Sequence, residues 1–330
     1  MLEDGTRAEV SYADLRVAAG KVAAQLQAAG VKPGDRVAGY MPNRIETVIA
    51  ALGAAWVGAV WSSCSPDFGV SGVLDRFGQI EPTVLVACDG YHYNGKWIDL
   101  GERIDALHDA LKPELLVVVP GKGNSTPVRR ALVWQTWLDS AGPAPDFAAL
   151  PFNHPLFILY SSGTTGQPKG AMLSHGNLRQ VVLAFFTDVE RLQPGYSILH
   201  PAPLSHGSGL YSLAAIHGGA NQVVPQSGQF EPKEIYELIA AYPGSFFFAA
   251  PTMVKRLVES SAAARADTTN LKSIVYGGGP MYLADLKAAM ALFGNKLAQI
   301  YGQGESPMTI SCLSTALHDG ASDDRLTSVG

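Results

Sequence analysis

A loop rich in glycine and hydroxyl side chains follows an apolar run near the middle of the chain. The apolar run is Leu156-Phe157-Ile158-Leu159, and the loop is Tyr160-Ser161-Ser162-Gly163-Thr164-Thr165-Gly166-Gln167-Pro168-Lys169-Gly170. Glycines let a backbone approach a ligand closely, and backbone N–H groups, hydroxyls and a lysine all donate to phosphate oxygens. The spacing is not that of a Walker loop. The sequence therefore predicts a phosphate-binding loop after a buried strand; the alternative is a flexible Ser/Gly loop.

Length and composition indicate a folded protein of two domains or subdomains. The chain has 330 residues, of which 47% are hydrophobic and 16% charged. Disordered chains are less apolar and more highly charged. The net charge of -5 gives no support for a nucleic-acid partner.

Targeting signals and cysteine usage favour the cytoplasm. Charged residues interrupt the first thirty positions, so no signal peptide is expected. The run 48–61 is apolar but shorter than the roughly 18 to 20 residues of a membrane span, and it is interpreted as a buried helix leading into a strand. Cys64, Cys88 and Cys312 are too far apart for a zinc spacing, and an odd, sparse count suits a reducing compartment.

Helical and strand-like patterns alternate along the chain. Ser11 with Asp14 predicts a helix start, because the pair has the spacing of a capping box. Apolar runs predict strands at 36–40, 84–87, 115–119, 157–160, 245–249, 273–276 and 297–301, and helical spacing predicts helices at 234–241, 252–260 and 283–293. Short apolar strands separated by helices predict an α/β fold with mostly parallel sheets flanked by helices. Ligands in such folds bind at the carboxyl ends of the strands.

Three further segments accompany the loop in a fixed order. They are Pro203-Leu204-Ser205-His206-Gly207, Tyr276-Gly277-Gly278-Gly279-Pro280 and Tyr301-Gly302-Gln303-Gly304-Glu305. Together with the loop 160–170, these segments resemble the signatures of the adenylate-forming enzymes, the acyl-CoA synthetase, luciferase and AMP-binding superfamily. Two other classes lack their motifs here: no G-x-S-x-G elbow of an α/β hydrolase and no G-x-G-x-x-G of a dinucleotide oxidoreductase is present.

The resemblance implies ATP-dependent activation of a small carboxylic acid to an acyl-adenylate, followed by transfer to CoA. The positions that match the phosphate loop are Ser161, Ser162, Gly163, Thr164, Thr165, Gly166 and Lys169. Those that match the adenine-contacting turn are Gly277, Gly278, Gly279 and Pro280, and Tyr301, Gly302, Gln303 and Gly304 match the second signature. Thr164, Lys169, His206 and Glu305 are the catalytic candidates, and Glu305 with Thr164 would hold Mg²⁺. The other seven histidines are expected in surface or packing roles.

The family likeness also implies a division of the chain. Residues 32–185 would form a first α/β subdomain that ends in the phosphate loop. Residues 186–330 would form a second one with the adenine and acyl sites, against which the helix within 1–31 would pack. In the family a barrel begins where this sequence stops, so the family's ribose-binding Asp, hinge and catalytic Lys would lie beyond Gly330. The expectation is the nucleotide-binding core of a synthetase; the alternative is an ATP- or AMP-binding fragment without turnover. A homodimer stays open.

Two details bear on the substrate. Many family members have Thr where this chain has Gly304, so a hydroxyl donor to the α-phosphate is absent. The segments 61–69, 89–91 and 93–96 resemble acetoacetyl-CoA synthetases, whereas the sequence from Gly170 onward is more similar to general fatty- or aryl-acyl-CoA synthetases. The resemblance implies that the acyl site is built largely from the later half, so the likeness to fatty- or aryl-acyl-CoA synthetases is given more weight, with a role in fatty acid metabolism.

Overall fold

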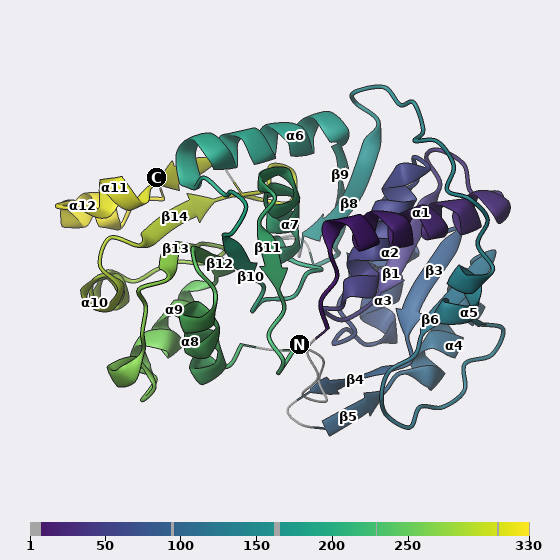
Figure 1. Ribbon diagram of the computed structural model, residues 1–330, viewed down its shortest axis with the longest axis horizontal. Coiled ribbons are helices and arrows are strands. Elements are labelled where there is room, and N and C mark those ends of the chain that lie inside the picture. The colour runs from purple at the N-terminus through teal and green to yellow at the C-terminus, as the bar shows by residue number, and fades with distance from the viewer. Residues whose placement is uncertain (1–7, 94–95, 162–165, 229, 309, 330) are drawn as a thin grey trace. The chain divides into compact units, whose positions relative to one another are not determined.

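The computed structural model describes residues 8–93, 96–161, 166–228, 230–308 and 310–329 (Figure 1). The chain divides into two compact units. The N-terminal unit runs to Leu178, and the C-terminal unit begins at Arg179, within helix α6 (His175–Ala184). Each unit is built around its own sheet. The division therefore falls a few residues before the expected boundary at 185.

The sheet of the N-terminal unit is almost wholly parallel. Its strands are β1 (Arg36–Tyr40), β2 (Val60–Cys64), β3 (Val84–Cys88), β6 (Leu115–Val119), β7 (Leu132–Val133), β8 (Pro155–Ser161) and β9 (Lys169–Ser174). Among the described residues the order is β7-β6-β3-β1-β2-β8-β9, and only the β8–β9 pair is antiparallel. The central strands are buried on both faces, which is why they are continuous apolar runs.

The helices of this unit lie on both faces of the sheet. They are α1 (Tyr12–Ala28), α2 (Ile45–Trp56), α3 (Val70–Phe77), α4 (Gly101–Leu111) and α5 (Trp134–Asp139), and a hairpin of β4 (Gly90–Tyr93) and β5 (Lys96–Asp99) precedes α4. In the sheet, β2 lies on one side of β1, whereas β3 and β6 lie on its other side. The chain therefore reverses its direction across the sheet after β2. Because crossovers are right-handed, α2 covers one face and α3 with α4 the other.

Helix α1 packs within the N-terminal unit. It lies against α2 and α5. Leu15, Val22 and Leu26 are buried in the same core cluster as the strands β1 and β3. Its start agrees with the sequence pattern, because the Ser11 hydroxyl accepts the Asp14 backbone N–H at 3.0 Å. Helical spacing identifies the buried face of a helix, but it does not identify the partner of that face.

The sheet of the C-terminal unit has the same design. Its strands are β10 (Ser197–Leu199), β11 (Asn221–Val223), β12 (Ser245–Ala249), β13 (Leu271–Tyr276), β14 (Leu297–Tyr301) and β15 (Ser311–Leu313). In the described part of the chain the order is β11-β10-β12-β13-β14-β15, with only β15 antiparallel to its neighbour. The order reverses between β10 and β12, which makes the carboxyl ends of these strands a topological switch point.

Helices also cover this second sheet on both sides. They are α7 (Gly207–Gly218), α8 (Pro232–Ala241), α9 (Pro251–Glu259), α10 (Leu283–Phe293), α11 (Thr315–His318) and α12 (Asp323–Leu326), with a π-helical turn η1 (Phe185–Val189) after α6 and a 3-10 turn η2 (Ala263–Arg265). Right-handed crossovers place α7 on one face and α8, α9 and α10 on the other. The predicted α/β fold with mostly parallel sheets is confirmed.

Candidate functional site

The predicted phosphate loop joins the only antiparallel strand pair that the structure describes in its sheet. β8 ends at Ser161, and β9 begins at Lys169, its register partner. Gly166 has φ +86, a left-handed conformation that favours glycine. The predicted residues Ser162, Gly163, Thr164 and Thr165 lie outside the described residues. The loop is therefore a hairpin connection at the sheet edge, with Lys169 exposed at its downstream end.

Two hydrogen bonds hold the flanks of this loop to the end of α3. The Tyr160 hydroxyl donates to the Arg76 carbonyl at 2.6 Å, and the Gln79 side-chain amide donates to the Pro168 carbonyl at 2.9 Å. Burial raises the pKa of Tyr160 to about 12, so its hydroxyl stays protonated and remains a donor. One neighbouring helix end thus holds both described flanks of the loop, at Tyr160 and Pro168.

The two glycine-bearing turns of the C-terminal unit lie at the carboxyl ends of adjacent strands. Gly277–Pro280 follows β13 and Gly302–Glu305 follows β14, and these strands pair in parallel. A Cβ on Gly277 would stand 2.5 Å from the Ile300 carbonyl oxygen, so only glycine permits this approach of the two strand ends. Gly278 has φ +79. The structure brings these two predicted segments together, at the edge where α/β sheets bind ligands.

The second turn is closed by hydrogen bonds of its own. The Gln303 N–H donates to the Ser306 carbonyl at 3.0 Å, and the Ser306 N–H donates back to the Gln303 carbonyl at 3.2 Å. The Gln303 side-chain amide also donates to the Tyr301 hydroxyl at 2.9 Å. Tyr301 is 39% exposed and Glu305 is exposed, so both side chains are accessible to a ligand.

His206 lies at the switch point of the same unit. It is the N-cap residue of α7, and its Nδ1 lies 3.0 Å from the Ser205 hydroxyl. The Phe248 ring, at the end of β12, lies 3.4 Å from where a Cβ of Gly207 would be and 3.8 Å from the corresponding point at Gly278. Phe248 therefore bridges the start of α7 and the turn 277–280. The sequence shows Phe248 only as part of a buried apolar strand, so nothing singles it out as a site residue.

The structure thus gathers the predicted site residues into two groups. Ser161, Gly166 and Lys169 belong to the hairpin of the N-terminal unit. His206, the turn 277–280 and the turn 301–305 belong to one sheet edge of the C-terminal unit. Among the described residues no cluster of three or more His, Cys, Asp or Glu side chains is arranged to hold a metal.

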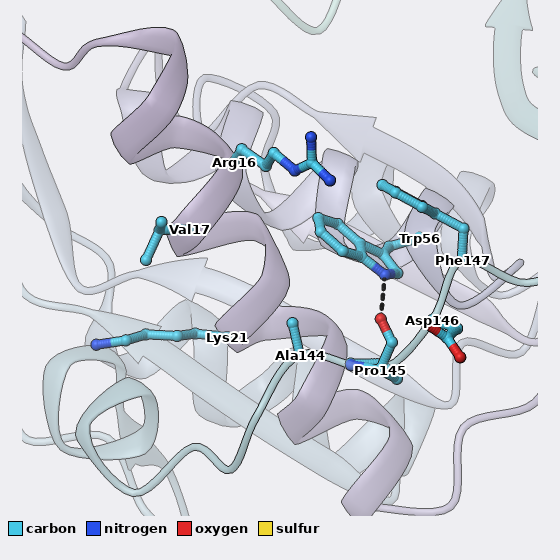
Figure 2. A pocket seen from close by; sticks show the side chains of 8 residues that line it. All are labelled: Arg16, Val17, Lys21, Trp56, Ala144, Pro145, Asp146 and Phe147. Atoms are coloured by element: carbon cyan, nitrogen blue, oxygen red, sulfur yellow. Dashed lines mark hydrogen bonds between the residues drawn. The ribbon is translucent and has the colours of Figure 1, made fainter.

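A surface groove in the N-terminal unit lies apart from all of these residues (Figure 2). Figure 2 shows Arg16, Val17 and Lys21 of α1 on one side and the segment 144–147 on the other. The Phe147 ring stacks on Trp56 with centroids 4.0 Å apart, and Trp56 Nε1 donates to the Pro145 carbonyl at 2.9 Å. These contacts attach the proline-rich segment to α2, and no predicted site residue lines the groove.

None of the helices formed by the described residues combines the length and apolar content of a bilayer crossing.

Curated relatives match about half of the chain. An acetoacetyl-coenzyme A synthetase from Rhizobium meliloti is 44% identical over 180 residues, which are 53% of this chain and 27% of the relative. An acetoacetyl-CoA synthetase from Xenopus tropicalis is 43% identical over 180 residues, or 51% of this chain and 27% of the relative. The aligned part is thus a minor share of each relative's own length.

Solved structures match nearly all of it. The acetoacetyl-CoA synthetase from Streptomyces lividans has a TM-score of 0.79 and 32% identity over 92% of this chain and 48% of its own. ATP-bound MatB from Rhodopseudomonas palustris has a TM-score of 0.77 and 25% identity over 91% of this chain and 56% of its own. The chain spans about half the length of these structures. The family model for AMP-binding enzymes matches residues 2–330, so the predicted resemblance is confirmed and the chain belongs to the AMP-binding enzyme family.

Proposed function

We propose that this protein takes part in the ATP-dependent activation of a carboxylic acid and its transfer to CoA. In the first step a carboxylate oxygen bonds to the α-phosphorus of ATP, the bond from that phosphorus to the β-phosphate bridge breaks, and pyrophosphate leaves. In the second step a thiol sulfur bonds to the acyl carbon, AMP leaves with the carboxyl-derived oxygen, and the thiol proton goes to solvent or a base. Both steps depend on positioning and charge stabilisation.

The observation that carries this proposal is the pair of glycine turns on β13 and β14. Their strands are neighbours in the sheet. The strand ends approach so closely that a Cβ on Gly277 would lie 2.5 Å from the Ile300 carbonyl oxygen, and the exposed Tyr301 ring lies at the same edge. An adenine needs a flat aromatic or peptide surface and backbone groups that approach closely. Glycines supply the second requirement because they have no side chain.

The hairpin loop is assigned to the outer phosphates of ATP. Lys169 provides a point charge at the start of β9, and Ser161 provides a hydroxyl opposite it. A pyrophosphate leaving group gains negative charge as its bond to the α-phosphorus breaks. A lysine that contacts its oxygens would stabilise that charge in the transition state.

Glu305 is assigned to Mg²⁺, and Thr164, the other position that the family resemblance gives to the metal, lies outside the described residues. A magnesium ion keeps several waters and takes one or two protein oxygens besides the substrate phosphates. Glu305 fits that requirement, because it is exposed at the end of a hydrogen-bonded turn and lies outside any cluster of carboxylates among the described residues. When bound, the ion would neutralise phosphate charge. Glu305 itself would orient the ion relative to the turn that carries Tyr301.

Two classes of carboxylic acid are candidate substrates. Relatives named acetoacetyl-CoA synthetase match about half of this chain, which supports acetoacetate. The sequence after Gly170 resembles synthetases for fatty or aryl acids. CoA is the proposed thiol in both cases, because the names of these relatives specify CoA.

Calorimetry and isotope exchange together test the proposal. We expect titration of ATP with Mg²⁺, and separately of AMP, to give saturable binding. We expect exchange of labelled pyrophosphate into ATP to require a carboxylic acid, with acetoacetate and a series of fatty and aryl acids compared at equal concentration. Absence of nucleotide binding contradicts the nucleotide assignment. Binding without acid-dependent exchange in the natural protein contradicts the acid activation.

A further inference from the structure

A buried histidine connects three elements next to His206. His200 follows β10 and is 1% exposed. Its Nδ1 lies 3.0 Å from the hydroxyl of Ser208, in the first turn of α7, and its Nε2 lies 3.2 Å from Oε1 of Gln222, in β11. Its backbone N–H donates to the Val223 carbonyl at 2.8 Å. Both ring nitrogens and the peptide nitrogen are therefore used.

The protonation of His200 follows from its partners and its burial. The Gln222 amide oxygen is an acceptor, so Nε2 carries the hydrogen and Nδ1 accepts the hydrogen of the Ser208 hydroxyl. Burial lowers the pKa of His200 to about 4, against the smaller raising effects of the Gln222 side chain and the Ser208 backbone. The ring is consequently neutral near pH 7 and keeps one tautomer, which gives each hydrogen bond a defined direction.

The partner of His200 is placed to control His206. Ser208 is 1% exposed and lies two residues after His206, the N-cap of α7. The His206 N–H donates to the Pro203 carbonyl at 3.0 Å, and the His206 carbonyl accepts from Gly209 at 3.0 Å. The segment from 203 to 209 is thus one hydrogen-bonded turn, and Ser208 connects it to the sheet. A fixed Ser208 therefore holds the orientation of His206 at the N-terminus of α7.

We propose that His200 is a positioning residue for His206, held by Gln222 on β11 and acting through the Ser208 hydroxyl on the first turn of α7. The inference rests on the proposed function, because His206 is one of the catalytic candidates that the family resemblance implies for it. His200 contacts no substrate in this scheme. Its contribution is to keep the His206 imidazole in one orientation, which a reaction governed by geometry requires.

A double-mutant cycle on acid-dependent pyrophosphate exchange tests this coupling. The Ser208→Ala substitution should lower kcat about fivefold, the size of one lost hydrogen bond, with the KM for ATP little changed. In a His206→Ala background the same substitution should have almost no further effect. Ser212→Ala is the matched control, because Ser212 lies in the same helix with a buried hydroxyl that has no hydrogen-bond partner among the described residues. It should leave kcat within about twofold of wild type.

Several results would contradict the proposed role of His200. Equal fold losses from Ser208→Ala in both backgrounds would show that Ser208 acts only on the fold, and the proposal would be wrong. An unchanged kcat for His206→Ala would overturn it as well. His200→Asn, whose amide reaches the position of Nδ1, should restore most of the kcat that His200→Leu loses. Equal loss in these two variants would contradict the role of the Nδ1 hydrogen bond.

Amide hydrogen exchange separates this proposal from the proposed function. Ser208→Ala and His200→Leu should each speed exchange across residues 206–210, whereas Ser212→Ala should not. This measurement needs no turnover. A wild-type protein without acid-dependent exchange would contradict the proposed function, and the amide data would then decide alone whether His200 fixes the turn.

Discussion

Ser161 and Lys169 are register partners in the β8–β9 ladder, so the predicted phosphate loop connects two residues that are paired across the sheet. The hydroxyl and the ammonium group are therefore carried by paired strands. Pairing gives these two residues fixed backbone positions, in contrast to residues carried on an unpaired loop. The last rung of the hairpin is held further by Tyr160, whose hydroxyl donates to the Arg76 carbonyl.

Replacing Lys169 by Ala should weaken ATP binding more than AMP binding. The side chain is assigned to the outer phosphates, which AMP lacks. The lost charge-assisted contact should cost ATP about 1.5 to 3 kcal/mol of binding free energy. Calorimetric titration with both nucleotides measures the difference, and Lys169→Arg is the control that keeps the charge. Equal weakening for ATP and AMP would contradict the assignment to the outer phosphates.

Changing Glu305 to Gln should reduce the dependence of ATP binding on Mg²⁺ without altering the fold. The substitution keeps the shape of the side chain and removes its charge. ATP affinity should be measured over a series of Mg²⁺ concentrations, with circular dichroism to verify folding. Glu237→Gln on α8 is the control, since its side chain is 66% exposed on the same unit. If Glu305→Gln and Glu237→Gln give the same magnesium dependence, Glu305 does not bind the metal.

Alanine at Gly277 should destabilise the C-terminal unit, whereas alanine at Gly279 should be tolerated. A Cβ at 277 would meet the Ile300 carbonyl oxygen at 2.5 Å, while one at 279 would have its nearest neighbour, Pro251 Cδ, at 3.9 Å. Overpacking of this kind costs about 1 to 3 kcal/mol. Thermal unfolding of both variants checks the contrast, and AMP titration reports whether the turn keeps its ligand geometry. Equal melting temperatures would show that the two strand ends separate easily.

We expect the free energy of unfolding to decrease below pH 6.5, in part because His200 is buried as a neutral ring. Its pKa in the folded protein is about 4, below the ordinary value of 6.5. The unfolded chain therefore binds the proton more readily, so the stabilisation is complete above pH 6.5 and is lost as the pH falls toward 4. The loss is about 3 kcal/mol at most. Denaturant unfolding of wild type and His200→Asn between pH 7 and pH 4 should show a shallower fall for the variant. Parallel curves would contradict the buried neutral ring.

The buried parallel strands were predictable from the sequence because burial on both faces demands continuous apolar runs. The predicted bounds 36–40, 115–119, 245–249 and 297–301 agree with β1, β6, β12 and β14. The edge strand β9 was not predicted, because it begins Lys169-Gly170 and leaves Met172 64% exposed, so it has no apolar signature. The hairpin of β4 and β5 and the short β15 lack that signature for the same reason.

The candidate site was predictable only where local sequence carries the information. The segments 277–280 and 301–305 could be proposed because each is a short continuous motif that resembles a family signature and follows a predicted strand. Phe248 and His200 were not singled out, since their importance depends on neighbours that the sequence separates widely, such as Gly278 and Gln222. The packing of α1 on α2 and α5 was missed for a related reason: an apolar helix face fits several surfaces equally well by pattern alone.

The reciprocal hydrogen bonds between Gln303 and Ser306 have an entropic consequence for ligand binding. Ordering the backbone of one free residue costs about 1 to 2 kcal/mol, and a ligand that must freeze a loose loop loses that much affinity per residue. The two hydrogen bonds order Gly304 and Glu305 within a closed turn, so a nucleotide bound at the proposed site would not have to order them. The flexibility of glycine at 304 is thereby restricted by the turn itself.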